Sequence, residues 1–360
     1  MKYISEFRDP EVAKRLIDKI HQTSTRPARF MEVCGTHTMA IAKFGLRDVL
    51  PPQVQLLTGP GCPVCVTANR DLDYGIALAK EDDTIVTSFG DMFRVPGSTT
   101  SLQEQRAQGR DVRIVYSPTD AVALAEEHPD KKVVFLGVGF ETTAPGAAAA
   151  LLLAKDKGLT NFYLHSAFKT MPLVLKALID LGEIDFQGYI LPGNVSVILG
   201  VEPYRFLADE YCVPGVIAGF EPVDILQAIL MLVEMVEADE ADIRVQYKRT
   251  VKLEGNPHAK AILEKVFEPC DADWRGIGMI PGTGLAIREE FASLDASKAF
   301  DISVESTVKT RGCRCGEVLR GLIRPNECKL FGKACTPANP IGPCMVSSEG
   351  ACAAFYKYEV

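Results

Sequence analysis

The stretch KVVFLGVGFETTAPGAAAALLLAK, residues 132–155, decides the fold class. It starts as an apolar strand at residues 132–138, turns through small and polar residues, and continues as a helix at residues 144–157. Similar apolar runs predict seven more strands, at residues 30–33, 54–58, 84–88, 112–116, 162–165, 189–191 and 216–219. Helix-forming segments separate most of these runs, and strands that alternate with helices form parallel sheets with both faces covered. The sequence therefore predicts an α/β fold of the doubly wound type.

The length of 360 residues predicts two domains, and the polar segment at residues 117–132 carries no strand. Similar patterns flank it: MEVCGTHT, LLTGPGCPV and TSFGD come before, and FLGVGFETT, ILPGNVSV and IAGFEPVD come after. Internal duplication explains this likeness, and so does convergent chemistry of strand-to-helix turns. We expect two similar parallel-sheet α/β domains at residues 1–120 and 121–245. A C-terminal region at residues 246–360 then ends in a small cysteine-rich module, which starts at about residue 308.

A net charge of −8 and a pI near 5.3 argue against a protein that binds nucleic acid through broad phosphate contact. The chain has no run of about 18 apolar residues, so we expect no transmembrane helix and no membrane partner. The charged N-terminal stretch MKYISEFRDPEVAKRLIDKI lacks the apolar core of a signal peptide. We therefore expect a cytoplasmic protein.

Eleven cysteines are many for a cytoplasmic protein, where structural disulfides are rare, so they indicate metal or redox chemistry. Six of them fall in the last 48 residues: Cys313, Cys315, Cys328, Cys335, Cys344 and Cys352. Their spacing contains no C-x2-4-C pair of the kind that zinc modules use. Four thiolates suffice for one [4Fe–4S] cluster, which leaves two for a dithiol/disulfide couple. Such a metal would also stabilise a segment too poor in apolar residues to fold alone.

This count resembles ferredoxin:thioredoxin reductase, in which a C-x-C alternates a cluster ligand with a redox-active cysteine. By that analogy Cys313 binds iron, and Cys315 is a redox cysteine that pairs with Cys344. The other cluster ligands are then Cys328, Cys335 and Cys352. A zinc site and three plain disulfides are the alternatives.

The pair Cys62 and Cys65 forms a C-x-x-C motif between a predicted strand and a predicted helix. The positive end of a helix dipole lowers the pKa of a thiol there, so a redox couple is the best interpretation. Half a zinc site and two inert buried thiols are the alternatives. Cys34 ends a predicted strand at the sheet edge where open α/β sheets bind ligands, and His37 follows three residues later. A metal ligand, a cysteine nucleophile and a buried structural thiol all remain open for Cys34.

Polar residues also end other strands. Asp91 follows one, and Glu141 follows another, where it fixes a ligand or only precedes the helix cap Thr143. His165 lies near a strand end as well. The chain has no P-loop motif, and we expect residues 281–284 to form a plain turn. We interpret Cys212 and Cys270 as plain thiols.

Together these motifs resemble the HypD family of [NiFe]-hydrogenase maturation factors. The matching stretches are CGTHTMAI (34–41), GPGCPVCVT (59–67), FGDMFRVPGS (89–98), GFETTAPG (139–146), LPGNVS (191–196), CRCGEVLRG (313–321), ECKLFGKACTP (327–337) and GPCMVSSEGACAAFYKY (342–358). They span nearly the whole chain in order. Two residues depart from the family pattern, since Asn194 and Phe168 stand where the family has histidine.

The resemblance implies two similar α/β domains, a [4Fe–4S] module and a scaffold on which Fe(CN)2CO is assembled with the small chaperone HypC. Cyanide comes from HypE, which HypF supplies. Cys34 then holds the iron together with a HypC cysteine, and Cys62 and Cys65 exchange electrons with the cluster through the second dithiol. His37, Asp91 and Glu349 match site positions of the family. A scaffold with redox activity is expected rather than a conventional turnover enzyme; the alternative is an iron–sulfur protein-disulfide reductase.

Overall fold

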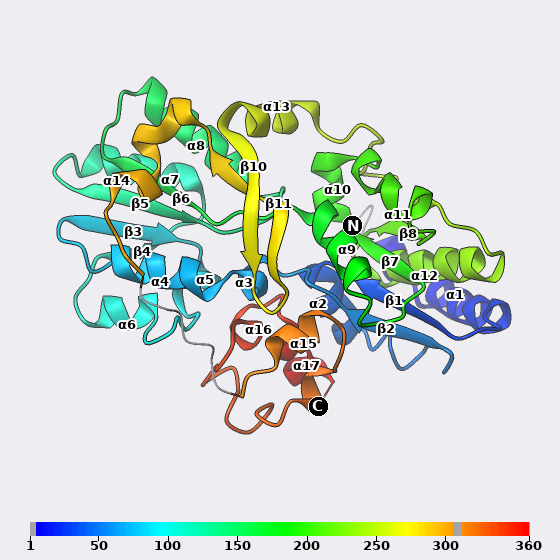
Figure 1. Ribbon diagram of the computed structural model, residues 1–360. Helices are drawn as coiled ribbons and strands as arrows, with labels where there is room; N and C mark the ends of the chain where they lie inside the picture. Colours follow the sequence, from blue (N-terminus) through cyan, green and yellow to red (C-terminus); the bar gives the residue numbers. More distant parts are fainter. Residues whose placement is uncertain (1–4, 305–311, 360) are drawn as a thin grey trace.

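The computed structural model describes residues 5–304 and 312–359, and Figure 1 shows two α/β units with a small module beside their junction. The first unit has a parallel sheet with the strand order β2-β1-β7-β8-β9. Its strands are β1 (Ala28–Glu32), β2 (Val54–Thr58), β7 (Gly188–Pro192), β8 (Gly215–Ala218) and β9 (Ile243–Val245). Counted within the sheet, this order is 2-1-3-4-5, a doubly wound order whose switch point lies between β1 and β7.

The second unit repeats this winding. Its parallel sheet has the order β4-β3-β5-β6, which is 2-1-3-4 when counted within the sheet. The strands are β3 (Thr84–Ser88), β4 (Val112–Ile114), β5 (Lys132–Gly137) and β6 (Phe162–Ser166). The switch point lies between β3 and β5. All eight strands expected from the sequence are therefore present, and the expectation of two similar parallel-sheet α/β units is confirmed.

The sheets do not follow the division expected at residue 120. β1 and β2 pair with β7, β8 and β9, and the second unit is inserted between β2 and β7. The reason is that β1 lies at the switch point and needs a partner on each side. Its second partner, β7, comes from far along the chain, with Phe30 opposite Gly188. Local strand patterns carry no information on that pairing.

Helices cover both faces of the first sheet, as the apolar strand runs require. Phe30 packs in the cluster that contains the long helix α12, whereas its neighbour Met31 packs in a different cluster on the opposite face. The helices of this unit are η1 (Ser5–Arg8), α1 (Pro10–Thr23), α2 (Gly35–Lys43), α10 (Gly193–Leu199), η2 (Glu202–Tyr204), α11 (Arg205–Asp209) and α12 (Pro222–Glu237). Those from β2 to β7 are α3 (Pro63–Val66), α4 (Asn69–Leu78), α5 (Gly90–Phe93), α6 (Leu102–Ala107), α7 (Pro118–Glu127), α8 (Ala144–Asp156) and α9 (Met171–Leu181).

An antiparallel hairpin lies across the junction of the two units (Figure 1). Helix α13 (Pro257–Val266) leads into β10 (Phe267–Trp274), which pairs with β11 (Gly278–Ile287). Residues 281–284, which we expected to form a plain turn, lie inside β11, because Gly284 pairs with Cys270 of β10. The chain then returns to the second unit through η3 (Glu289–Leu294) and α14 (Ala296–Ala299), which contact β6.

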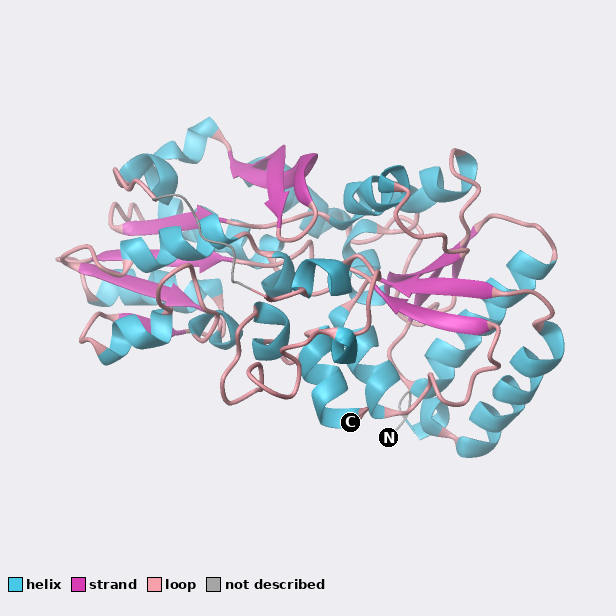
Figure 2. Cartoon of the chain, turned by 60° about the horizontal axis from the view of Figure 1, so that its bottom comes forward, coloured by secondary structure: helices cyan, strands magenta, loops and turns pink. Residues whose placement is uncertain are grey.

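The cysteine-rich tail forms the small module. It contains α15 (Cys315–Leu319), η4 (Pro325–Glu327), α16 (Pro343–Val346) and α17 (Ala351–Tyr358). Figure 2 shows the arrowheads of both parallel sheets directed toward the middle of the molecule, where this module lies. Helix α17 contacts α2 of the first unit, and α16 contacts α3. The carboxyl ends of both sheets therefore face the cysteine-rich tail.

An ion pair between a buried carboxylate and a partly exposed arginine lies beside the loop that follows β8. Asp224, in the first turn of α12, has no exposed surface and accepts hydrogen bonds from Arg249 Nη1 and Nη2 at 2.7 and 2.5 Å. Gln246 donates to the same carboxylate at 2.9 Å and accepts from the Gly219 N–H at 3.0 Å. The pair therefore fixes the loop that follows β8.

We expect Arg249→Met to lower the free energy of unfolding by about 3–5 kcal/mol, because it leaves the Asp224 carboxylate buried without its cation. Urea unfolding at neutral pH measures this change. The control is Arg244→Met, which removes an exposed pair with Glu240 and should cost about 1 kcal/mol or less. Equal losses in the two variants would contradict the role of the buried pair.

Candidate functional site

Cys34 lies at the switch point of the first sheet, directly after β1. It is the N-cap residue of α2, and its side chain is buried. Its backbone N–H donates to Glu32 Oε2 at 3.2 Å. Burial, together with the smaller effect of the Glu349 charge, raises the pKa of the Cys34 thiol to about 12. The free thiol is thus protonated at neutral pH, and a soft metal ion that binds it must displace the proton.

The loop after β2 packs on Cys34 backbone to backbone. A side chain on Gly61 would place its Cβ 2.1 Å from the Cys34 nitrogen, so only glycine fits there. The Gly61 carbonyl accepts a hydrogen bond from the Gly35 N–H at 2.9 Å. This contact brings the C-x-x-C motif, which follows Gly61 directly, next to Cys34.

His37 does not turn its imidazole toward another candidate residue. Its Nε2 lies 2.9 Å from the Gly219 carbonyl, and its ring stacks on Phe220 at 4.8 Å. Burial lowers the pKa of His37 to about 4, so the imidazole is neutral at physiological pH. Its backbone N–H interacts with the Cys34 thiol and lowers the pKa of that thiol. The side chain thus ties α2 to the loop after β8.

The C-x-x-C motif forms a disulfide between Cys62 and Cys65. Cys62 is the N-cap of the short helix α3, as the sequence predicts, and both residues are buried. Helix α3 contacts α16, which carries Cys344. The motif therefore lies between Cys34 on one side and the tail on the other.

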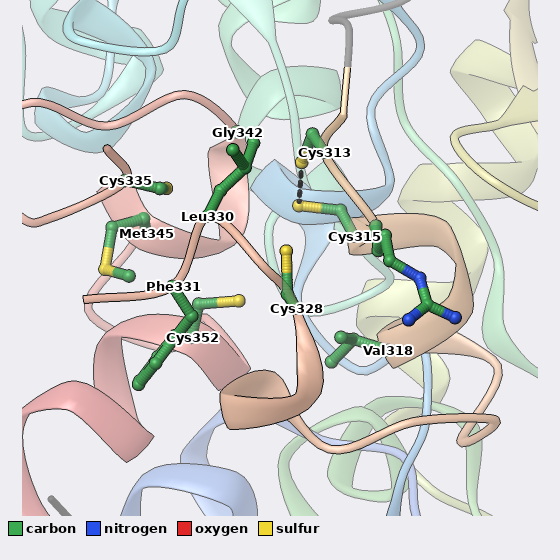
Figure 3. Close-up of a pocket in the computed structure, with 11 residues that line it drawn as sticks. Cys313, Cys315, Val318, Cys328, Leu330, Phe331, Cys335, Gly342, Met345 and Cys352 are labelled. Atoms are coloured by element: carbon green, nitrogen blue, oxygen red, sulfur yellow. Dashed lines mark hydrogen bonds between the residues drawn. The ribbon is translucent and has the colours of Figure 1, made fainter. Parts of the chain in front are cut away.

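Five tail cysteines line a single cavity (Figure 3). They are Cys313, Cys315, Cys328, Cys335 and Cys352. The sulfur atoms of Cys313 and Cys315 are 3.3 Å apart. Gly342 closes the cavity, since a Cβ there would lie 2.6 Å from Cys313 Sγ and 2.8 Å from Cys315 Sγ. The other lining residues are mainly apolar, which suits a set of soft thiolate ligands.

Cys344 is not among the residues that line this cavity, and it has no exposed surface. Thiols of Cys313, Cys344 and Cys352 interact with Cys315 as hydrogen-bond partners and lower the pKa of Cys315. Cys315 and Cys344 are therefore close together, as a dithiol pair requires. Cys344, the sixth tail cysteine, thus lies near the five that line the cavity.

The donor set of the cavity is compatible with an iron–sulfur site. A [4Fe–4S] cluster takes each thiolate on a separate iron atom, so its ligands stand further apart than those of one ion. Within residues 5–304 and 312–359, no three His, Cys, Asp or Glu side chains form a group that could hold a metal ion.

Asp91 and Glu349 anchor the loop between α16 and α17. Asp91 Oδ2, from the second unit, accepts hydrogen bonds from Ser347 Oγ at 3.0 Å and from the Ser348 N–H at 3.3 Å. Glu349 Oε1 accepts from Thr36 Oγ1 of the first unit at 2.7 Å. The two carboxylates therefore connect the tail to both units, and Glu349 lies beside the residues that follow Cys34.

The structure gives the remaining candidates different surroundings. Asn194 is exposed in the first turn of α10, after the strand that neighbours β1. Phe168 is buried, packs edge-on against Phe267 at 5.8 Å, and thus fills a core position.

His165 stacks on Tyr74, with 4.5 Å between the ring centroids. Among the plain thiols, Cys212 is exposed and Cys270 is half-buried.

Glu141 holds the helix that follows β6. Its side chain is buried, and Oε1 accepts a hydrogen bond from the Met171 N–H, at the start of α9, at 2.8 Å. Burial raises the pKa of Glu141 to about 7. Thr143 is the N-cap of α8, as expected, but its side chain makes no capping hydrogen bond.

Sequence reasoning missed Glu32 and Arg275. Burial raises the pKa of Glu32 to about 8, and its Oε1 accepts a hydrogen bond from Thr38 Oγ1 at 2.6 Å. A carboxylate inside the apolar run that ends at Cys34 was the available signal. Arg275 lies in the hairpin near Cys313, Cys315 and Cys344, and no motif marks it.

Comparison with known proteins agrees with this geometry. The sequence profile of HypD, described as "Hydrogenase formation hypA family", matches residues 11–359. The chain belongs to the HypD family. It is 44% identical over 368 aligned positions to hydrogenase maturation factor HypD2 of Bradyrhizobium diazoefficiens, covering 99% of this chain and 97% of the relative. HypD of Cupriavidus necator is 43% identical with the same coverage, and HypD of Escherichia coli is 42% identical, covering 99% of this chain and 98% of the relative.

Membership in the HypD family makes this chain a hydrogenase maturation factor. The disulfide-reductase alternative is not favoured. The relatives match nearly the whole chain, and they are named hydrogenase maturation factors. No helix in the described part of the chain is long and apolar enough to cross a membrane.

The buried Glu141 predicts a pH dependence of stability. Its folded pKa lies above the unfolded value of 4.5, so the folded state binds the extra proton between pH 4.5 and about 7. That contribution is complete below pH 4.5 and is lost as the pH rises through 7. Relative to Glu141→Gln, the wild-type free energy of unfolding should fall between pH 5 and 7.5, by at most about 1.4 kcal/mol per pH unit. Parallel stability curves for the two proteins would contradict the shift.

The contact at Gly61 predicts a second effect. Gly61→Ala should lower the free energy of unfolding by about 1–3 kcal/mol, since the methyl group meets backbone atoms of Cys34 that cannot rotate away. Gly146→Ala is the matched control in helix α8, where the nearest atom lies 3.8 Å from the new Cβ. It should be neutral or slightly stabilising. Thermal unfolding of both variants tests the difference.

Proposed function

We propose that this chain is the scaffold on which the Fe(CN)2CO group of [NiFe]-hydrogenases is assembled, in complex with a HypC-type chaperone. One observation carries the proposal: Cys34, the Cys62–Cys65 disulfide and the cysteine-rich tail converge where the carboxyl ends of the two sheets face each other. Membership in the HypD family supports it. A cytoplasmic protein that receives cyanide from a HypE-type donor fits this role.

Cys34 is the proposed anchor of the iron that is built up as cargo. Its thiol is a soft ligand, which suits iron with cyanide and carbonyl groups. Backbone N–H groups of Thr36 and His37 interact with the sulfur and favour its thiolate form. The Glu349 carboxylate opposes that form through its charge. The iron's own charge then retains the thiolate, and a HypC cysteine is the proposed second ligand.

The tail is the proposed site of a resident [4Fe–4S] cluster, held by Cys313, Cys328, Cys335 and Cys352. These four thiols line the same cavity. When bound, such a cluster supplies electrons one at a time. Cys315 and Cys344 are the proposed dithiol next to it.

The proposed exchange runs between the two cysteine pairs. A thiolate of the Cys315/Cys344 pair attacks the Cys62–Cys65 disulfide, whose S–S bond breaks as a mixed disulfide forms. The second thiol of the tail pair then attacks the mixed disulfide and closes a Cys315–Cys344 bond. Two electrons pass to Cys62 and Cys65, and the two thiol protons are transferred with them. Contact between α3 and α16 supports this route.

An infrared spectrum of the anaerobically purified protein, isolated with its HypC-type chaperone, tests the scaffold role. We expect cyanide and carbonyl stretching bands in the wild type, and their complete loss in Cys34→Ala with the iron and sulfide of the tail retained. The matched control is Cys212→Ala, which removes an exposed thiol and should keep the bands. Loss of the tail iron in Cys34→Ala would contradict separate sites. A wild-type spectrum without bands, in the presence of the chaperone, would contradict the scaffold role.

A further inference from the structure

We propose that Arg275 is a positioning residue that stabilises the reduced form of the Cys315/Cys344 pair with a buried positive charge. This inference rests on the proposed redox function of that pair. Arg275 lies in the turn of the hairpin, between the segment that follows the C-x-x-C motif and the tail cysteines Cys313 and Cys315.

The hairpin is fixed to the segment that follows the C-x-x-C motif. The Arg275 N–H donates to the Val66 carbonyl at 2.9 Å, and Arg275 Nε donates to the Thr67 carbonyl at 2.8 Å. The preceding residue, Trp274, is fully buried and forms a β-bridge with Thr67. The guanidinium is thus held at a defined place beside α3, with one of its nitrogens committed to the backbone.

The same hairpin packs on the helix that starts at Cys315. A Cβ on Gly276 would lie 2.2 Å from Gly316 Cα, so the two backbones touch and neither residue tolerates a side chain. Arg275, Gly276 and Gly316 line one groove together with Cys313 and Cys315. Arg275 therefore lies between the disulfide segment and the tail thiols.

The charge of Arg275 interacts mainly with thiols, and more weakly with the Asp73 carboxylate. Its Nη2 is buried and has no hydrogen-bond partner among the described residues, and Arg275 forms no ion pair with any of them. Burial lowers the pKa of Arg275, and electrostatic interactions with Cys315, Cys344 and Cys313 act in the opposite direction. The other arginines of the groove differ, since Arg314 pairs with Glu317 and Arg320 pairs with Glu183.

A cation in this position favours one redox state of the pair. Reduction of a Cys315–Cys344 disulfide takes up two electrons, breaks the S–S bond and leaves two sulfurs that carry negative charge or bind protons from solvent. Arg275 attracts the negative charge in the reduced state and has no such interaction with the neutral disulfide. The pair is then easier to reduce, and less reducing, than it would be without the cation.

The redox equilibrium of the tail tests this role. Holoprotein is equilibrated anaerobically with mixtures of reduced and oxidised dithiothreitol, alkylated, and analysed by mass spectrometry of the Cys315 and Cys344 peptides. For Arg275→Gln we expect the equilibrium constant for reduction of this pair to fall about tenfold, which equals about 30 mV. Arg275→Lys keeps the charge and should match the wild type. Arg320→Gln, a control that removes a paired arginine of the same groove, should also match it.

Each outcome bears on a different claim. An unchanged constant in folded Arg275→Gln, with a reversible pair in the wild type, overturns the inference and leaves Arg275 as a structural tether. If circular dichroism shows that Arg275→Gln does not fold, Arg275→Lys decides, because a tenfold shift with the charge retained also overturns it. A wild-type tail whose Cys315 and Cys344 never form a reversible pair contradicts the proposed redox function itself.

Discussion

The backbone contact between Gly61 and Cys34 is the constraint on which the rest of the site depends. It joins the ends of β1 and β2 so closely that the loop after β2 cannot carry a side chain there. As a result, a thiol at the switch point of one sheet and a disulfide at the start of α3 share one small region. Neither α2 nor α3 could move apart from the other without opening this contact.

The site is shared among segments that are distant in sequence. Asp91 holds the tail from the second unit, and Glu349 holds it against Thr36 of the first. The hairpin adds a further connection through Arg275. Because each segment supplies only part of the sulfur chemistry, their relative placement matters as much as the cysteines themselves. Partly buried hydrogen bonds to Asp91, to Glu349 and from Arg275 secure that placement.

Much of this arrangement could be predicted from local sequence, and the remainder depends on long-range pairing. Strands such as β5 were recognisable because both faces are buried, and Cys62 because a helix starts at it. The partner of β1 was not recognisable, since the pairing of Phe30 with Gly188 leaves no mark on either segment. Arg275 was missed for a similar reason: its neighbours Val66 and Cys315 come from other parts of the chain, and a single arginine carries no motif.

The insertion of the second unit has a consequence for how the protein is made. During synthesis, β1 and β2 emerge first, but their sheet stays incomplete until residues 188–192 leave the ribosome. The strands β3 to β6 follow one another in the sequence without interruption, so all four strands of their sheet are available before β7. The tail comes last and docks on surfaces that both units have by then formed. The two units therefore form around Cys34 and the disulfide segment before the six tail cysteines have been translated.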